Sequence, residues 1–232
     1  MVAKENSWCA QFSWSPRGVL LSQQNSATFL RDGEEVHIAN RDLMAAAAPY
    51  HVKDGYAFVA YPNRDSRPFR ELYGISEAQT FVRGSLRYEG NPALVRALAD
   101  LGWLDPAEKA WLGPDMTWAR IQQRVTAASS ATETELVSKV DELCTFRSPA
   151  EREQVLAGLR WIGLFSDDEA PVRDTLLDTI STRLYELCKF RPGERDLVML
   201  QHKFVIEWED GSTVSCGNIY NHYLYSEDSK GY

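Results

Sequence analysis

Apolar residues recur at helical spacing between about residues 91 and 190. A stripe over residues 94–101 begins directly after a proline and ends at a glycine, which are typical helix boundaries. Thr132-x-x-Glu135 and Ser148-Pro149-x-Glu151 have the spacing of capping boxes ahead of two further stripes, and Asp174 precedes a fourth. This part of the sequence predicts an inserted all-α domain over residues 91–190.

The flanks of this helical centre carry β-type patterns. Residues 55–61 and 79–88 are rich in β-branched and aromatic side chains. Residues 197–208 alternate between apolar and polar side chains ahead of Asp210-Gly211, which predicts a hairpin. Strand-rich ends around a helical centre predict an α+β fold, a mixed sheet with an all-helical insertion. We expect the sheet domain to be formed by residues 1–90 together with return strands in 191–232.

Three smaller features of the flanks carry expectations of their own. Residues 19–30 have apolar positions at helical spacing and end before the turn signal Asp32-Gly33, which predicts a helix. His202 lies on the apolar face of its strand; with no orienting carboxylate nearby in sequence, a core histidine is favoured over a proton shuttle. Residues 217–232 are polar and tyrosine-rich without a period, so a loop or an irregular, truncated tail is expected.

Composition and charge narrow the possible partners. The 232 residues are 44% hydrophobic and 25% charged, which excludes a disordered or collagen-like chain. The formal net charge is −8, and such a field repels polyanions, so we expect no nucleic-acid partner. An anionic ligand would therefore need individual arginines placed against the overall field.

The cysteines and the apolar runs indicate the compartment. The four cysteines are far apart and form no C-x-x-C pair, so the spacing predicts no zinc site and no disulfide framework. No apolar run approaches the roughly 18 residues of a membrane span, and the amino terminus does not resemble a signal peptide. We therefore expect a cytoplasmic protein without a membrane partner.

General catalytic motifs do not identify a chemistry. The sequence contains neither G-x-G-x-x-G nor G-x-x-x-x-G-K-[ST], so neither fingerprint of a phosphate-cradling glycine loop is present. It also contains neither G-x-S-x-G nor H-E-x-x-H. Composition and periodicity alone leave the function open.

A set of longer motifs resembles one enzyme family. FSWSPRGVLL, DLMAAAAPY, GYAFVAYPNRDS, VRGSLRYEGNP, LRWIGLFSD and ERDLVMLQHKF follow one another in the family's order over about residues 12–213. On these motifs the chain resembles the saccharopine reductases, the glutamate-forming, NADP-dependent saccharopine dehydrogenases of lysine biosynthesis by the α-aminoadipate pathway. The resemblance implies an oxidoreductase that interconverts aminoadipate semialdehyde plus glutamate and saccharopine with NADP(H). After Ser212 the sequence departs from the family pattern.

The resemblance also implies an architecture and a binding site. It implies a Rossmann-type nucleotide domain, a substrate-binding α/β domain and an inserted helical domain, of which the Rossmann domain is expected to be absent from this chain. NADP(H) is thus expected for the complete enzyme and not for this chain alone. The family's substrate-binding arginine corresponds to Arg17, and a guanidinium suits the three carboxylates of saccharopine. A second family contact corresponds to Ile38, Ala39 and Asn40. Catalytic residues stay unknown, and no metal ligand is expected.

Alternatives stay open at several of these positions. Arg17 could instead pair with a local carboxylate, and Arg83 and Arg87 could attract an acidic substrate or form a solvated face. Arg64 and Asp65 fit a ligand loop and a local salt bridge equally well. The whole chain could need a nucleotide domain in cis or in trans. It could also be a non-catalytic fragment that acts as a binding or interaction module, or the product of an incomplete gene model. A homodimer is possible in either case.

Overall fold

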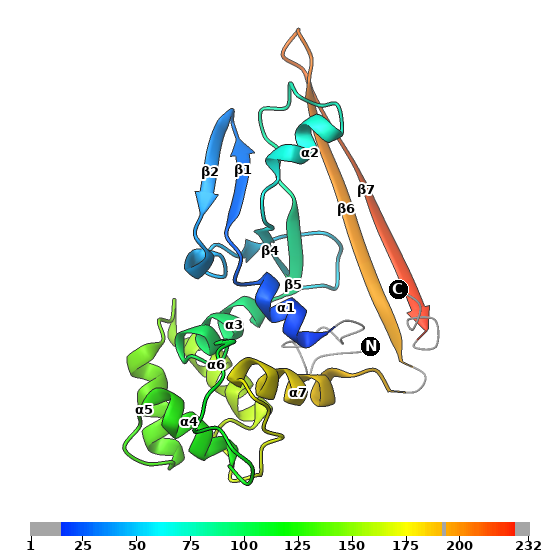
Figure 1. Ribbon diagram of the computed structural model, residues 1–232. Helices are drawn as coiled ribbons and strands as arrows, with labels where there is room; N and C mark the ends of the chain where they lie inside the picture. Colours follow the sequence, from blue (N-terminus) through cyan, green and yellow to red (C-terminus); the bar gives the residue numbers. More distant parts are fainter. Residues whose placement is uncertain (1–14, 192–193, 226–232) are drawn as a thin grey trace.

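The computed structural model describes residues 15–191 and 194–225. Strands gather in the amino-terminal part, helices follow, and a long two-stranded ribbon ends the described chain (Figure 1). The elements in order are α1 (Pro16–Ser22), β1 (Ala27–Arg31), β2 (Glu34–Ile38), a 3₁₀ turn (Asn40–Asp42), β3 (Ala48–Pro49), β4 (Phe58–Pro62), α2 (Arg67–Leu72), β5 (Gly84–Tyr88), α3 (Asn91–Asp100), α4 (Trp118–Thr126), α5 (Glu133–Leu143), α6 (Pro149–Ile162), α7 (Leu176–Cys188), β6 (Arg195–Glu207) and β7 (Thr213–Tyr225).

The amino-terminal strands form two small antiparallel sheets. β1 and β2 make a hairpin whose register runs from Ala27 opposite Ile38 to the turn. Asp32 and Gly33 both have positive φ there, the backbone that tight two-residue hairpins require. β3, β4 and β5 form the second sheet, in that order. The predicted helix over 19–30 is wrong beyond Ser22, because its second half pairs with β2 as a strand and is buried at its first three positions.

The helices α3–α7 pack around a shared apolar core. Trp103 and Trp118 lie at its centre, with ring centroids 5.7 Å apart, and both are essentially unexposed. The Ser148 hydroxyl accepts a hydrogen bond from the Glu151 amide at 3.1 Å, as the capping-box spacing predicts. The matching prediction at Thr132 is wrong in detail, since α5 starts there without a side-chain cap.

The start of α7 matters for the site, because a side-chain cap fixes its first turn. Asp174 does not cap the helix; Thr175 does, and its hydroxyl accepts from the Asp178 amide at 2.9 Å. Thr175 itself is buried, so this first turn of α7 is fixed against the core. The acidic residue bonded to the cap is therefore Asp178, the third residue of the helix, and not Asp174, which precedes it.

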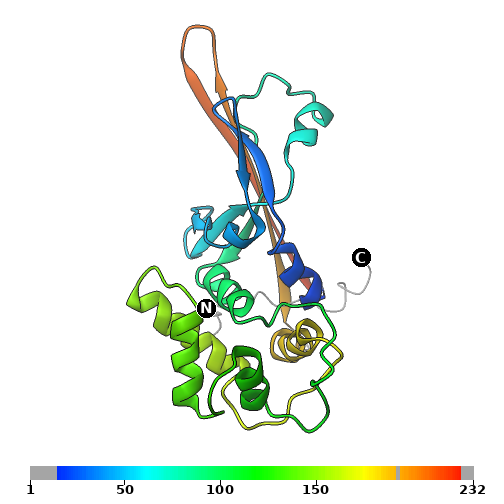
Figure 2. The same ribbon diagram turned by 60° about the vertical axis from the view of Figure 1, so that its left-hand side comes forward.

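The ribbon β6–β7 stands apart from the other sheets. Its 13 residues on each strand pair only with each other among the described strands. Its turn lies at the end of the molecule away from helices α3–α7 (Figures 1 and 2). The hairpin prediction is confirmed, whereas the expected loop over 217–225 is wrong, because these residues complete β7. Residues 226–232 of the predicted tail lie outside the described residues.

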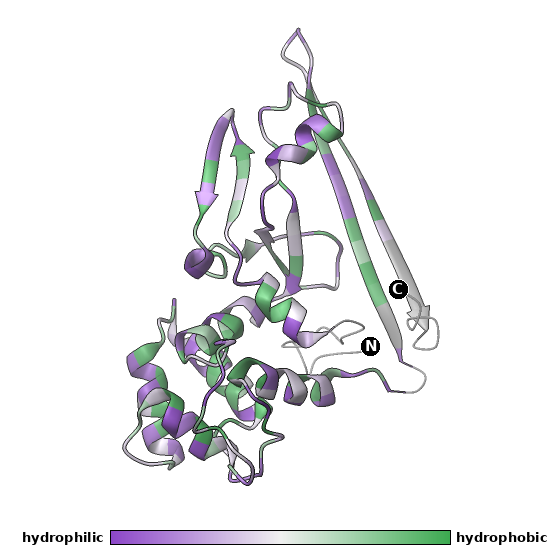
Figure 3. Cartoon of the chain, viewed as in Figure 1, coloured by the Kyte–Doolittle hydropathy of each residue, from purple (hydrophilic) through white to green (hydrophobic). Residues whose placement is uncertain are grey.

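One face of this ribbon is apolar and uncovered. Residues opposite each other in an antiparallel pair share a face, so Leu200 lies beside Tyr220 and Phe204 beside Cys216. Hydrophobic stretches at 197–200 and 204–206 flank a hydrophilic one (Figure 3). Leu200 and Phe204 are each 51% exposed. His202, on the same face, is also exposed, so the expectation of a core histidine is wrong.

Cysteine states and helix lengths complete the description. Cys144 is a buried free thiol and Cys216 an exposed one. Cys188 is disulfide-bonded, so the expectation that the cysteines form no disulfide is wrong at this residue. Within the described residues, no helix combines the length and the apolar character that crossing a membrane requires.

Candidate functional site

Arg17 lies in the first turn of α1, where Pro16 starts the helix. α1 packs beside α7, so the side chain of Arg17 reaches the helical part of the molecule (Figure 1). Its Nε donates a hydrogen bond to Oδ1 of Asp178 at 2.7 Å, across 161 positions of sequence. The two side chains are 43% and 35% exposed, so the pair is accessible from solvent.

Asp178 is held on its other side by the helix cap. The Thr175 hydroxyl donates to Oδ2 of Asp178 at 2.6 Å, so the two carboxylate oxygens serve different donors. The hydrogen bond from Thr175 and the charge and hydrogen bond of Arg17 hold the pKa of Asp178 below its usual range. The carboxylate is therefore ionised at neutral pH and keeps Arg17 in a defined place.

Among the residues that the structure describes, this arrangement leaves one edge of the Arg17 guanidinium without a partner. Within residues 15–191 and 194–225, only Nε has a hydrogen-bond partner, and the two terminal nitrogens have none. Two parallel N–H groups at this edge match the two oxygens of a carboxylate. The predicted alternative of a local carboxylate is partly realised, because Arg17 does have an acidic partner, but that partner comes from a distant helix.

The other predicted binding residues lie at the end of the β1–β2 hairpin. Ile38 pairs with Ala27, which places it at the end of the hairpin that connects to α1. Ala39 starts the 3₁₀ turn, and the Asn40 side chain accepts from the backbone of Arg41 at 2.8 Å. No hydrogen bond joins these three residues to Arg17 in the described part of the chain, so a role for them in binding stays a prediction.

The remaining candidate cations have local partners. The Arg83 guanidinium stacks 3.8 Å from the ring centroid of Phe69. Arg87 donates from Nη1 to the carbonyl of Leu86 at 2.8 Å, and among the described residues no ion pair holds either arginine in place as Asp178 holds Arg17. Asp65 does form a local salt bridge, but its partner is Arg67 and not Arg64.

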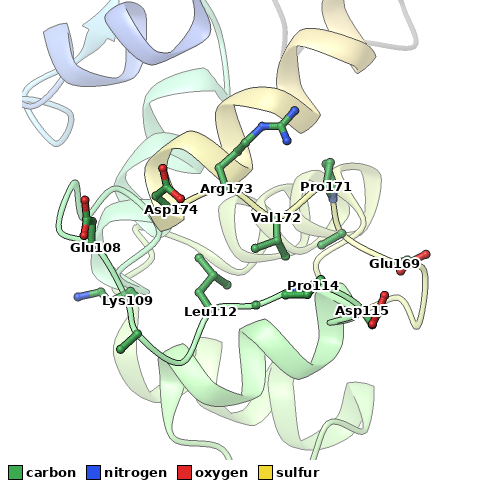
Figure 4. A pocket seen from close by; sticks show the side chains of 13 residues that line it. Glu108, Lys109, Leu112, Pro114, Asp115, Glu169, Pro171, Val172, Arg173 and Asp174 are labelled. Atoms are coloured by element: carbon green, nitrogen blue, oxygen red, sulfur yellow. The ribbon is translucent and has the colours of Figure 1, made fainter.

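A pocket of about 700 Å³ lies between two loops of the helical part, residues 108–115 and 169–174 (Figure 4). Backbone hydrogen bonds tie the loops together at both ends, from Lys109 to Asp174 and from Ala170 to Met116. Apolar side chains point toward its middle, and the charged residues stand around it. Four of those are acidic and two are basic: Glu108, Asp115, Glu169 and Asp174 against Lys109 and Arg173.

This balance makes the pocket a poor site for a ligand with several carboxylates. An acidic rim repels anions, and the Lys109 ammonium is already paired with Asp105. The Arg17–Asp178 pair offers the better carboxylate site, although it lies outside the pocket. Asp178 and Thr175 were missed by sequence reasoning; the Thr175-x-x-Asp178 spacing is the signal that could have found them.

Metal and nucleotide sites were tested on the same residues. No group of three or more acidic, histidine or cysteine side chains suited to a metal occurs in the described residues. Every pair among the strands named above is antiparallel, so these strands do not form the parallel strand–helix–strand unit of the dinucleotide motif. No chemical step is derived through the nucleotide from these residues.

Comparison with known proteins gives consistent matches. The family model described as "Saccharopine dehydrogenase C-terminal domain" matches residues 2–232. Saccharopine dehydrogenase [NADP(+), L-glutamate-forming] of Pyricularia oryzae is 47% identical over 210 residues, 90% of this chain and 47% of the relative. The Saccharomyces cerevisiae protein of the same name is 46% identical over 88% of this chain and 46% of its own.

A solved structure and a more distant relative extend the comparison. The apo histidine-tagged saccharopine dehydrogenase (L-Glu forming) from Saccharomyces cerevisiae matches with a TM-score of 0.89 and 42% identity, over 98% of this chain and 53% of that one. The mitochondrial alpha-aminoadipic semialdehyde synthase of Bos taurus is 30% identical over 87% of this chain and 22% of its own. The chain thus spans about half the length of the fungal relatives.

Proposed function

The chain belongs to the saccharopine dehydrogenase C-terminal domain family, and on that premise we propose that it is the saccharopine-binding portion of an NADP-dependent, L-glutamate-forming saccharopine dehydrogenase. The complete enzyme would interconvert aminoadipate semialdehyde plus glutamate and saccharopine in lysine biosynthesis, in the cytoplasm. The observation that carries the proposal is the open edge of the Arg17 guanidinium, fixed by Asp178 at 2.7 Å.

Saccharopine suits this site because it carries three carboxylates. One carboxylate can accept two parallel N–H bonds from the terminal nitrogens of Arg17, an arrangement stronger than a neutral hydrogen bond. The end of β2 and the turn after it, at Ile38, Ala39 and Asn40, could supply backbone amides to a second group. Arg17 binds and orients the substrate in this proposal, and no proton transfer is assigned to it.

The nucleotide is assigned to the other half of the enzyme. Because the strands named above do not form the parallel unit of the dinucleotide motif, we propose that a separate domain, in cis or in trans, holds the nicotinamide against the imine carbon. Residues 1–90 and 191–232 would form the substrate-binding domain, and 91–190 the helical insertion. The positions of α3–α7, all between Asn91 and Cys188, support this division.

Calorimetric titration of the purified chain with saccharopine tests the proposal. Arg17→Ala should weaken binding by about 10-fold to 100-fold, the effect of losing a charge-assisted pair. Arg173→Ala is the matched control, because it removes the same charge from the acidic pocket. Equal binding by wild type and Arg17→Ala would contradict the assignment, and a loss in Arg173→Ala alone would transfer the site to the pocket.

A non-catalytic interaction module is the second candidate, and the ribbon favours it. Leu200, Phe204 and Trp208 are each more than half exposed, on an element that no other described strand covers. Sedimentation velocity over a range of concentrations tests this candidate. Association that disappears in Phe204→Ser would support it, whereas a monomer at every concentration would contradict it.

A further inference from the structure

We propose that Asp178 is the positioning residue of the substrate-binding arginine: it holds the Arg17 guanidinium by Nε so that the terminal nitrogens face the ligand. This inference rests on the proposed function, because it takes Arg17 as the carboxylate-binding group. It adds a residue from the helical part of the chain to a site that the family motif places in the sheet part. Asp178 would act through Arg17 and would not touch the substrate.

The geometry restricts how Asp178 can hold the arginine. Oδ1 accepts from Arg17 Nε at 2.7 Å, whereas Oδ2 is occupied by the Thr175 hydroxyl at 2.6 Å. A carboxylate oxygen can accept more than one hydrogen bond, but in the structure Oδ2 is turned to Thr175 and the contact with Arg17 is through Nε alone. Among the described residues, the planar group keeps its far edge for another acceptor.

The anchor on the Asp178 side is rigid. Thr175 is only 6% exposed and is bonded twice to Asp178, by its hydroxyl as donor and as acceptor. Leu176 and Leu177, between the two residues, are buried in the core. Arg17, in contrast, sits on a seven-residue helix whose described neighbour across the pair is α7. The direction of the arginine is thus set mainly by the acid.

Asp178 has two effects on ligand binding by Arg17, one through its charge and one through the orientation of the guanidinium. An ionised Asp178 repels an anionic ligand and partly neutralises Arg17, so its charge alone opposes binding. Its benefit must come from orientation, since a flexible arginine loses more rotamer freedom on binding than one already held. Two substitutions therefore have different expected effects: Asp178→Asn keeps an oxygen acceptor without the charge, and Asp178→Ala removes both.

Saccharopine titration of the full chain makes the test. Asp178→Ala should weaken binding by about tenfold, whereas Asp178→Asn should bind within about threefold of wild type. Asp174→Ala, which removes a nearby acid that does not contact Arg17, should leave affinity unchanged. Unchanged or tighter binding by Asp178→Ala would overturn the proposal, because Asp178 would then be neutral or a competitor of the ligand.

A second measurement works without any ligand and separates this inference from the proposed function. In proton–nitrogen NMR spectra of the arginine side chains, the Arg17 Nε–H signal should be protected from solvent exchange in wild type and in Asp178→Asn. The protection should be lost in Asp178→Ala, with an unchanged circular dichroism spectrum. Equal protection in Asp178→Ala would overturn the inference. Protection that depends on Asp178, in a chain that does not bind saccharopine, would overturn only the proposed function.

Discussion

The helical part and the β6–β7 ribbon both have clear apolar faces, and only one of them buries that face. Leu159 and Ile162 on α6 are not exposed at all, whereas Leu200 and Phe204 on β6 are half exposed. The comparison teaches that a pattern identifies the apolar face of an element but not the layer that will cover it.

The difference follows from what each region has to pack against. Helices α3–α7 pack on one another and share a core around Trp103 and Trp118. The ribbon has two strands and no third layer among the described residues, and a lone hairpin is only marginally stable in water. The Arg17–Asp178 pair is built on the packed side, because its acid belongs to α7.

Thiol labelling should give the largest contrast between the two regions. Burial raises the pKa of the Cys144 thiol, in the helical part, to about 12. At pH 8 only about one Cys144 thiol in ten thousand would then be the reactive thiolate. Cys216 lies exposed on the ribbon. In native protein, iodoacetamide should modify Cys216 at least about 1,000-fold faster than Cys144, by peptide mass spectrometry, and similar rates would show that the helical core opens readily.

Truncating one leucine in each region should give the next largest difference. Leu159→Ala empties a fully buried position and should cost about 2–5 kcal/mol of unfolding free energy. Leu200→Ala removes a side chain that is already half in water and should cost less than about 1 kcal/mol. Urea unfolding followed by circular dichroism compares them. Equal costs would mean that the ribbon face is covered in solution.

Local signals account for the parts of the fold that could be predicted. Helices α3 and α6 follow from their stripes and boundaries, because Pro92, Ser148 and Gly163 act through neighbouring residues only. The helix prediction over 19–30 failed at Thr28 and Phe29, whose conformation depends on pairing with β2. The ribbon strand over 217–225 likewise depends on its partner strand, and its own residues show no alternation.

The same distinction between local and long-range signals applies to the candidate site. Arg17 could be singled out by its motif, but its pairing with Asp178 could not be predicted, since 161 residues separate the two. Nothing in the neighbourhood of either residue encodes the packing of α1 on α7. The core assignment of His202 failed for the opposite reason: its face is apolar as predicted, but no layer covers it.

Acid should weaken the helical part through Glu151. Burial raises the pKa of this carboxyl, but the hydrogen bonds and charge of Arg147 and the charge of Arg96 lower it by more, so its pKa lies below its ordinary value. The stabilisation is therefore complete above the ordinary pKa and is lost as pH falls through the lower native value. Glu151→Gln should cost about 1–3 kcal/mol at pH 7.

The same variant should also show a flatter loss of stability in acid, since the titrating group is gone. Urea unfolding at pH 7 and below pH 4.5 measures both effects. Glu153→Gln is the matched control on the same helix, because its side chain is 67% exposed and should change stability by less than about 0.5 kcal/mol. A pH profile unchanged in Glu151→Gln would assign the acid sensitivity to other carboxylates.

Two glycines, one in the helical part and one in the ribbon, allow a matched test with a smaller expected effect on stability. Gly163 ends α6 with φ +100°, and Gly211 forms the ribbon turn with φ +78°. An alanine at either position adopts a left-handed backbone at a cost of about 1–2 kcal/mol. A Cβ at position 163 would also lie 3.3 Å from the Arg183 guanidinium, whereas one at position 211 would meet open space.

The expected difference lies in where that cost is felt. Because α6 is packed into the common core, Gly163→Ala should lower protection from hydrogen–deuterium exchange throughout α3–α7. Gly211→Ala should raise exchange in β6 and β7 only, with the helices unchanged, because the ribbon is not coupled to the core through buried contacts. If Gly211→Ala also loosened the helices, the ribbon would be an integral layer of the fold, and its apolar face would need a covering partner within the same molecule.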